Sequence, residues 1–600
     1  MSLKKWSVVL GVLLVASMVL TACPAPQPQV VEKVVTQVVE KEVKVVETQV
    51  VETVKEVEKV VEVVATAVPV AEEKVLRINL GSYPDIIDPQ KSSFVNEIAH
   101  LQMIYEGLTS LDKDLNTVPG AAEKWEYSAD LTELTFTMRE DSKYSDGSLL
   151  NAARFEYSLQ RNVNPETAGE YAAITDEILG APEWRGCEGD ACEAAAAVVD
   201  ESIQALHADG AACVDPVYED AACNTLKVKL SKPAPYFHTV LGLWVTFPAK
   251  EENITEGGEQ WWNSSKYHTG NGPYVLASLE PFVRARFTPN EFYFDGVGKV
   301  DIEYSYITDS AVAFEAYKND EFDIVPLAAE DLAVVQADPV LSQEANIYPG
   351  SCTYALMFHQ LKEPFTDQKV REAFAYALDR ETWVRDVLSG LGSPALTWIP
   401  PGFPGFDAEE SRFAFDPEAA KKAIAESSYG SIEALPPIKL TFSDSPRNRT
   451  RYEWLAAKWK DVLGVEVTLD PVEPTTYTSL TKDIETSPLA YILGWCADYP
   501  DPQNWLSVYW KTGAFGQRIG YSNPELDKML DAADTEADPA TRAQMYADAQ
   551  RFLTDGAPVA FFWNNVNSYL IKPWVTGVQK TPQDAGWPGD ITPITVDIQK

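Results

Sequence analysis

The chain has 600 residues, 45% of them hydrophobic, and a formal net charge of -41. Because a single hydrophobic core stops growing beyond about 250–300 residues, this length predicts two or three lobes. The acidity argues against nucleic acid as a partner, since binding a phosphate backbone requires clustered Lys and Arg residues. It suits a soluble protein that works outside the cell.

The N-terminus predicts export and lipidation. Lys4 and Lys5 precede an apolar run over residues 8–20, which has signal-peptide length and is short for a transmembrane span. The run ends in Leu-Thr-Ala-Cys, similar to a bacterial lipobox, so we expect 1–22 to be a lipoprotein signal peptide and Cys23 to carry lipid. The alternative is an ordinary secretory cleavage site with a chance Cys. Lipid on Cys23 would anchor the protein extracytoplasmically, in the periplasm or on the outer face of a bacterial cell membrane.

Residues 23–74 are predicted to be a spacer. A Pro- and Gln-rich stretch leads into residues 30–68, which are almost only Val, Glu, Lys, Thr and Gln. Val residues recur there at spacings of three and four, close to a heptad seam. Val is a poor helix former, so two interpretations stay open. Residues 30–68 form either a self-associating coiled-coil stalk or a charged, extended tether.

Strands alternating with helices predict an α/β fold for the remainder of the chain. The predicted strands cover 75–80, 131–138, 225–230, 283–287 and 300–306. The predicted helices cover 151–161, 311–319, 368–389, 417–426, 448–463, 523–533 and 539–554. Between these elements, 180–222 is a Cys-bearing excursion rich in Ala and Asp.

The chain has seven cysteines. With Cys23 assigned to lipid, an even number remains, which in an exported protein indicates disulfides. These are Cys187, Cys192, Cys213, Cys223, Cys352 and Cys496. Six cysteines allow 15 connectivities. The first four form two pairs close in sequence, which we expect to close local loops as Cys187–Cys192 and Cys213–Cys223.

The sequence carries no signature of catalysis, of a metal centre or of a cofactor. The five His residues include no i,i+4 pair, and HExxH, GxSxG, GxxxxGK[ST] and CxxC spacings are missing. The chain is instead rich in aromatic residues, with 16 Trp, 26 Tyr and 23 Phe. Most of them belong in the core, while some can form the flat walls of a ligand cleft. We therefore expect a binding protein and not an enzyme.

Eight segments, in order, resemble the oligopeptide-binding proteins of ABC importers, in solute-binding family 5. That family also holds dipeptide- and nickel-binding members. The segments are PDIIDP (84–89), YEGLTSL (105–111), the run 135–172 with its SDG turn, GNGPY (270–274), TDSAVAFEAYKNDEFDI (308–324), PFTDQKVREAFAYALDRETWV (364–384), GWCADYPDP (494–502) and YLIKPWVTG (569–577). The resemblance covers 75–600. The four-Cys excursion departs from the family pattern.

The resemblance implies a type II periplasmic-binding-protein fold, with two α/β lobes that enclose the ligand, a hinge and an extra lobe inserted near the start. The chain would cross between the enclosing lobes near Ser351 and return near Pro573. The implied division is lobe I over 75–116, 237–350 and 574–600, lobe II over 117–236, and lobe III over 351–573.

The resemblance also implies a peptide site. Asp498 would receive the peptide α-amine, and the backbone of Gly494, Cys496 and Ala497 would pair with the peptide main chain as an added strand. A turn-capping role for Asp498 is the alternative. The family further implies a disulfide from Cys352 to Cys496, with a buried free thiol as the alternative.

Four further residues are candidate cleft walls because they adjoin the matched motifs: Trp495, Tyr499, Asn271 and Trp563. The group that receives the peptide carboxylate is not identified, and every Arg and Lys of lobe III is a candidate. A buried ligand charge without a partner costs several kcal/mol, of the order given by transfer data, so such a group is expected.

The predicted function is capture of short peptides by lobe closure, for delivery to the permease and ATPase subunits of an ABC importer. Two alternatives stay open. Relatives with Trp-rich clefts take oligosaccharides, and a surface sensor or interaction lipoprotein would use 30–68 for assembly. No cofactor is expected.

Overall fold

The computed structural model describes residues 74–140 and 142–600. The predicted signal peptide, the lipidation site Cys23 and the spacer over 30–68 lie outside these residues. All described residues belong to one unit, 71–600. Among them, no helix has the length and apolar character needed to cross a membrane.

The principal element of the fold is a mixed sheet of 11 strands within the described residues. Its order is β15 (Val467–Val472), β14 (Ile438–Ser443), β16 (Ala490–Cys496), β12 (Ala345–Phe358), β17 (Val559–Ile571), β11 (Ile324–Pro326), β1 (Val75–Asn79), β10 (Asp301–Ser305), β9 (Arg284–Pro289) and β8 (Tyr274–Glu280), with β13 (Ser393–Pro394) beside β17. β1 pairs in parallel with β10, and β12 pairs antiparallel with both β16 and β17. This mixed α/β architecture confirms the predicted fold class.

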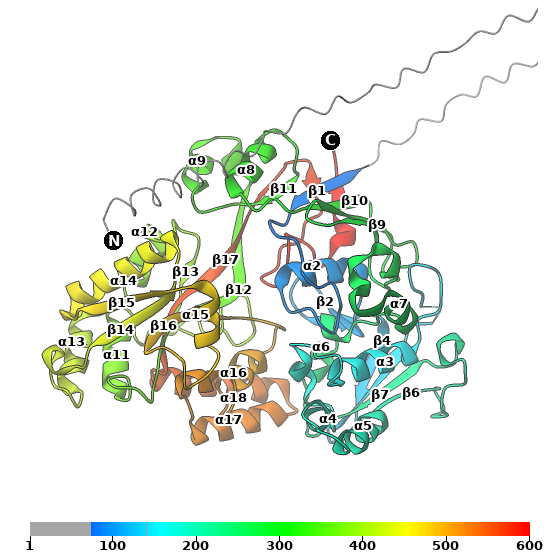
Figure 1. Ribbon diagram of the computed structural model, residues 1–600, viewed down its shortest axis with the longest axis horizontal. Helices are drawn as coiled ribbons and strands as arrows, with labels where there is room; N and C mark the ends of the chain where they lie inside the picture. The colour runs from blue at the N-terminus through cyan, green and yellow to red at the C-terminus, as the bar shows by residue number, and fades with distance from the viewer. Residues whose placement is uncertain (1–73, 141) are drawn as a thin grey trace, which may run out of the picture. The chain divides into compact units, whose positions relative to one another are not determined.

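The long strands β12 and β17 join the two halves of the sheet (Figure 1). β12 pairs with β17 from Ala345 opposite Leu570 to Met357 opposite Val559. The far end of β17 also pairs with β11, in the half that contains β1. The crossing that the resemblance implies near Ser351 lies in β12, and β17 ends two residues before Pro573.

A separate four-stranded sheet lies within the segment that the resemblance assigns to lobe II. Its order is β4 (Ala122–Tyr127), β5 (Glu133–Met138), β7 (Thr225–Lys229) and β6 (Ile203–Leu206). Helix α3 (Ala152–Val163) contacts β6 and β7. A short hairpin, β2 (Thr109–Leu111) with β3 (Thr117–Pro119), precedes this sheet.

The Cys-bearing excursion is more regular than the sequence suggests. It contains α4 (Ala181–Arg185), α5 (Ala191–Ser202) and the edge strand β6. β6 pairs antiparallel with β7, and its first residue, Ile203, is fully buried. An Ala-rich segment has high helix propensity, and the buried apolar residues at its end attach it to the sheet. The excursion therefore supplies an edge strand as well as loops.

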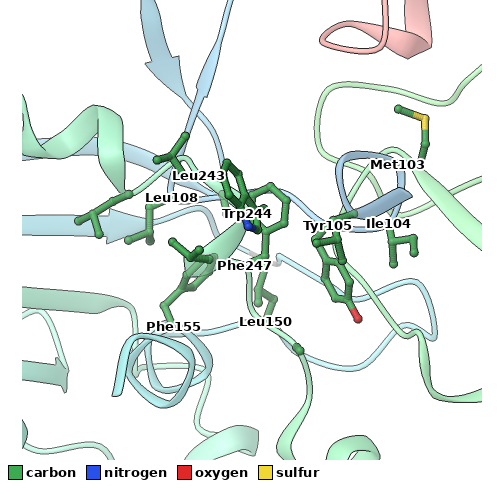
Figure 2. Close-up of a cluster of buried hydrophobic side chains, with 14 of the residues drawn as sticks. Met103, Ile104, Tyr105, Leu108, Leu150, Phe155, Leu243, Trp244 and Phe247 are labelled. Atoms are coloured by element: carbon green, nitrogen blue, oxygen red, sulfur yellow. The ribbon is translucent and has the colours of Figure 1, made fainter. Parts of the chain in front are cut away.

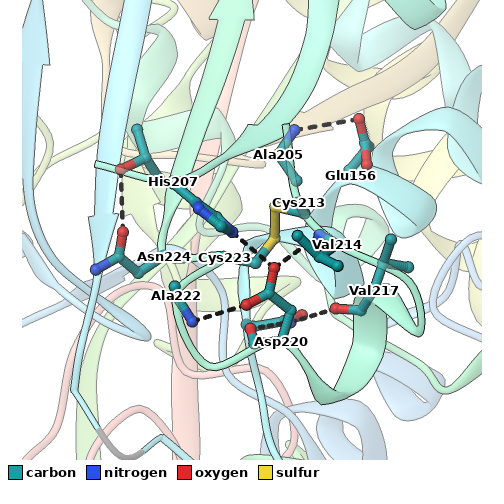
Figure 3. Close-up of a disulfide and its surroundings, with 12 residues drawn as sticks. Glu156, Ala205, His207, Cys213, Val214, Val217, Asp220, Ala222, Cys223 and Asn224 are labelled. Atoms are coloured by element: carbon teal, nitrogen blue, oxygen red, sulfur yellow. Dashed lines mark hydrogen bonds and ion pairs between the residues drawn. A yellow bond between two sulfur atoms is a disulfide. The ribbon is translucent and has the colours of Figure 1, made fainter. Parts of the chain in front are cut away.

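The structure contains two disulfides in this excursion, Cys187–Cys192 and Cys213–Cys223, which are the two expected local pairs. Figure 3 shows the second, with the Asp220 carboxylate beside it. That carboxylate accepts from the Val214 and Ala222 N–H groups and lies 2.7 Å from His207 Nε2.

His207, Cys213 and Asp220 place their ligand atoms within 4.8 Å of one another. The Cys213 sulfur is bonded to Cys223, however, and a metal ligand would have to be a thiolate. The carboxylate is also occupied by backbone N–H donors. We therefore assign this cluster to closing the loop.

The predicted helix over 368–389 is wrong as a single element. The structure has two helices there, α11 (Gln368–Tyr376) and α12 (Arg380–Asp386). Asp379 breaks the run because its side chain caps α12, accepting from the Thr382 N–H at 3.1 Å. An Asp at an N-cap satisfies a free helix donor and so competes with continuous helix.

Other helices follow the predictions closely. They are α8 (Ser310–Lys318), α13 (Pro417–Glu426), α14 (Pro446–Leu463), α17 (Pro524–Thr535) and α18 (Pro539–Asp555). α13, for example, begins with a Pro in its first turn, and the side chain of Asp416 caps it. Both features stabilise a helix start and are visible in the sequence.

Buried side chains from lobes I and II form one continuous core, part of which Figure 2 shows. Met103, Ile104 and Tyr105 come from the end of α2 (Val95–Ile104) and the residue after it, and Trp244 and Phe247 approach from a later segment. Tyr499, from the segment assigned to lobe III, packs into the same core. Lobe III is therefore in contact, through at least one buried aromatic ring, with the core that lobes I and II share.

We predict that Arg380 in α12 is a major contributor to stability. Its buried guanidinium donates to the carbonyls of Ala375, Leu378, Ala395, Phe413 and Phe561. Arg380→Met would remove the side-chain donor that these carbonyls share, so we expect a loss of about 3 kcal/mol, measured by urea unfolding.

The matched control is Arg385→Met in the same helix. Arg385 is exposed, and among the described residues it pairs with the adjacent Asp386 alone, so its loss should cost less than about 1 kcal/mol. Equal unfolding midpoints for the two variants would contradict the role assigned to Arg380.

Candidate functional site

A cavity of ≈ 450 Å³ lies between the segments assigned to the enclosing lobes. Its walls include Tyr105, Trp244 and Phe247 on one side and Cys352 and the segment 494–499 on the other. The volume falls in the range of about 300–1,000 Å³ that is typical of small-molecule sites. This cavity is the candidate binding site.

Strand β16 brings the predicted peptide-pairing residues to the cavity. Cys496 lies opposite Cys352 and Gly494 opposite Tyr354 in the β12–β16 ladder. The expected disulfide Cys352–Cys496 is present, with a Cα–Cα distance of 4.0 Å. Only Gly fits at position 494, because a Cβ there would lie 2.8 Å from the Tyr354 ring.

The free edge of β16 faces away from β12. The Ile492 N–H donates to the Tyr452 hydroxyl at 3.1 Å, and the Ile492 carbonyl accepts from Tyr477 at 2.6 Å. Backbone groups of a strand point to the same edge at every second residue, so Gly494 and Cys496 present theirs on the edge that Ile492 uses. Beyond Ala490, no described strand pairs with that edge. An extended ligand has room to add there as a strand.

Asp498 lines the cavity directly after this strand. One carboxylate oxygen accepts from Asn504 Nδ2 at 2.9 Å, and no described Lys, Arg or His forms an ion pair with it. Burial raises the pKa of Asp498 to about 6, against a smaller opposing effect of the Asn504 hydrogen bond. The carboxylate is thus held out of bulk water with a single neutral donor.

The turn-capping alternative for Asp498 receives no support among the described contacts. Helix α16 (Pro502–Trp510) is capped by Asp501, whose side chain accepts from the Gln503 N–H at 2.9 Å. No described backbone N–H donates to the Asp498 carboxylate. Its backbone N–H instead donates to Asn504 Oδ1, as does Trp495 Nε1, both at 3.2 Å. Asn504 therefore fixes this segment from α16.

The structure brings six of the eight predicted ligand-binding residues together. Gly494, Trp495, Cys496, Ala497, Asp498 and Tyr499 all line the cavity.

The other two residues are not among its walls. Asn271 is buried, where its side chain accepts from the Glu106 N–H and donates to the Glu106 carbonyl. Trp563 stacks on Tyr354 with ring centroids 4.6 Å apart, in the core of lobe III. Adjacency to a motif in sequence did not bring these side chains to the ligand.

Sequence reasoning missed three carboxyl groups that line the same cavity: Glu106, Asp584 and Asp590. Burial raises the pKa of Glu106 to about 7, although the Tyr293 hydroxyl donates to it at 2.8 Å. Burial also raises the pKa of Asp584 to about 6, and burial together with repulsion from Asp584 raises the pKa of Asp590 well above its ordinary value. Glu106 stands in the YEGL segment, whereas no local signal distinguished the two C-terminal Asp residues.

A second, more open pocket of ≈ 900 Å³ is lined by residues of both signs. Lys232, Lys482 and Arg518 are among its walls, together with Glu177 and Asp483. It contains none of the residues 494–499 that the sequence predicts to bind ligand. Its mixed charge distinguishes it from the first cavity, whose charged walls are all acidic.

The fold and the site define the chain as an extracytoplasmic solute-binding protein of the type II class. Its residues 116–517 match the family model for bacterial extracellular solute-binding proteins, family 5. The chain belongs to this family, as the sequence segments suggested.

The chain is similar to curated members of the oligopeptide and dipeptide branch. It is 28% identical to the dipeptide-binding protein DppE of Bacillus subtilis, with 85% of this chain and 90% of DppE covered. It is 29% identical to the periplasmic oligopeptide-binding protein OppA of Escherichia coli, with 86% and 92% covered.

Among solved structures, the unliganded open form of the periplasmic murein tripeptide-binding protein MppA superposes with a TM-score of 0.70 at 27% identity. The superposition covers 88% of this chain and 98% of that one.

We predict that Asp498 destabilises the ligand-free protein at neutral pH. Its pKa rises from 3.8 to about 6 on folding, so the folded state holds more protons between these values. Stability then falls as pH rises through this window, and the full cost persists above about pH 6. Asp498→Asn removes the cost and keeps an oxygen acceptor for Asn504.

The test is the melting temperature of Asp498→Asn and the unaltered protein across pH. The variant should melt higher at about pH 7.5, and the two curves should converge below about pH 4, where the carboxyl is neutral in both states. A variant that melts lower at about pH 7.5 would refute this assignment.

Proposed function

We propose that this protein is the peptide-capturing subunit of an ABC importer. The single observation that carries the proposal is the geometry around β16, where the edge beyond Ala490 pairs with no described strand and leads directly to a carboxylate that no described cation pairs with. Main-chain pairing gives affinity that does not depend on the side chains of the peptide, and the carboxylate is a partner for the free α-amine of the peptide. Family membership supports the same class of ligand.

In this mechanism the peptide lies along the edge formed by Gly494 and Cys496, with its amine at Asp498. The disulfide to Cys352 and the Asn504 contacts hold this edge before ligand arrives, so little ordering is required on binding. Ligand contacts both walls of the cavity only when the lobes are closed. Binding therefore shifts the population toward the closed form.

Delivery and attachment complete the proposal. A permease with its ATPase binds the closed form. Lipid on Cys23 anchors the protein on the outer side of the membrane. The segment 30–68 separates this anchor from the lobes. Cys23→Ala should release the protein from the membrane fraction. Sedimentation of soluble protein with and without 30–68 tests whether that segment also drives self-association.

The identity of the cargo can be read by native mass spectrometry of the purified protein. A series of co-purifying short peptides supports the proposal, and a bound glycan overturns it in favour of an oligosaccharide-binding protein. No turnover of the bound molecule is expected.

We predict that Asp498 pairs with the peptide amine. Acetylating the N-terminus of a bound tripeptide should weaken binding to the unaltered protein by at least about 30-fold, equivalent to about 2 kcal/mol. Asp498→Asn should bind the free peptide as weakly as the acetylated one. Isothermal titration calorimetry measures all four affinities.

The four affinities form a thermodynamic cycle that isolates the pair from general damage. If Asp498→Asn lost as much affinity for the acetylated peptide as for the free one, the variant would be perturbing the site rather than removing an ion pair. That result would remove Asp498 from the amine-binding role.

A further inference from the structure

The charged side chains that line the cavity all have the same sign. Four carboxyl groups are present, and the lining residues include no Lys, Arg or His. The carboxyls are Glu106, Asp498, Asp584 and Asp590. Among the described residues, none of the four forms an ion pair. Within the described chain, the carboxyls at the cavity wall therefore have no ion-pair partner that would offset a negative charge.

The groups that do hold these carboxyls are neutral donors. Glu106 accepts from the Tyr293 hydroxyl, and Asp584 accepts from the Tyr348 hydroxyl at 2.7 Å and the Thr581 N–H at 3.1 Å. Asp590 accepts from backbone N–H groups of the turn before it, such as that of Gly586 at 2.6 Å. Neutral donors position a carboxylate but do not cancel its charge.

One further wall residue has a side-chain oxygen that accepts no hydrogen bond from the described residues. Gln583 Nε2 donates to the Ala497 carbonyl at 2.8 Å, which fixes the orientation of the amide, and no described group donates to its buried Oε1. An ammonium group carries three donors and no acceptor. Its chemistry matches both the carboxylates and this amide oxygen.

We propose that the cavity selects ligands with at least two positive charges, namely short peptides that carry a basic side chain besides the α-amine. This inference deepens the proposed function and rests on it. With Asp498 paired to the amine, Glu106 and Asp584 are the partners for the basic side chain. The Asp590 carboxylate already accepts from backbone N–H groups of its own turn, so we assign it no ligand contact.

The same walls disfavour acidic ligands. A Glu side chain would be buried beside like charges, and the peptide's own C-terminal carboxylate meets no cation at the cavity wall. That carboxylate contributes least when it stays hydrated at the mouth of the site. The net charge of -41 adds long-range attraction for cations.

The test is a titration series with three free-ended tripeptides, Ala-Lys-Ala, Ala-Ala-Ala and Ala-Glu-Ala, with C-amidated Ala-Ala-Ala and with spermidine. We expect Ala-Lys-Ala to bind about tenfold or more tighter than Ala-Ala-Ala, and Ala-Glu-Ala about tenfold or more weaker. Amidation should leave affinity unchanged or improve it. Raising salt should reduce the differences.

Protein variants identify the responsible groups. Glu106→Gln and Asp584→Asn should each weaken binding of Ala-Lys-Ala by a larger factor than binding of Ala-Ala-Ala, so that the ratio of the two affinities falls. The matched control is Glu315→Gln on the exposed face of α8, which should change neither affinity. Melting temperatures identify variants that fail to fold, and the peptide series on unaltered protein stands without them.

The outcomes separate the two proposals. Equal affinities for all three tripeptides, or tightest binding of Ala-Glu-Ala, would overturn the charge selectivity and leave peptide capture intact. Loss of binding on amidation would also overturn it, because a cation for the carboxylate would then exist. Binding of spermidine without any peptide would overturn peptide capture and retain cation selectivity.

Discussion

The fold depends on the backbone pairing of β12 with β17. The chain crosses between the two halves of the main sheet in β12 and returns in β17. The hydrogen-bonded ladder between these two strands therefore joins the two halves. β16 in turn pairs along the second edge of β12, and a disulfide joins the two strands at Cys352 and Cys496. The proposed peptide-pairing edge is thus attached directly to the element that joins the lobes, where lobe movement displaces it least.

The energetics of the cavity are the reverse of those of an ordinary core. Buried polar groups are usually satisfied, and buried charges are usually paired. Here Glu106, Asp498 and Asp584 are desolvated, and the described groups that donate hydrogen bonds to them are neutral. Desolvation raises the pKa of each carboxyl, and the hydrogen bonds offset it only in part. Such an arrangement costs stability in the free protein and is relieved by a cationic ligand. The preference for a cationic ligand therefore arises from the desolvated carboxyl groups of the protein itself.

Local sequence signals predicted the parts of this structure that depend on local physics. Capping residues and Pro in the first turn located α13, and alternation located β7. The same reasoning failed where a capping Asp379 competes with good helix formers and divides one predicted helix. The segment 494–499 was found because its residues are contiguous. Glu106 and Asp584 were missed because they lie far apart in the sequence and come together only in the folded cavity. No local sequence pattern predicts that arrangement.

In the proposed mechanism of lobe closure, one hydrogen-bonded contact between the lobes also favours the closed form. Gln503, beside the site in α16, donates to the Tyr236 hydroxyl at 3.1 Å, and that hydroxyl donates to Glu177 at 2.6 Å. This chain of hydrogen bonds joins the segment after Asp498 to lobe II without touching the cavity contents. Because hydrogen bonds contribute only about 1 kcal/mol each, it biases the closed form weakly. Ligand must supply the rest, which keeps closure dependent on what the cavity holds.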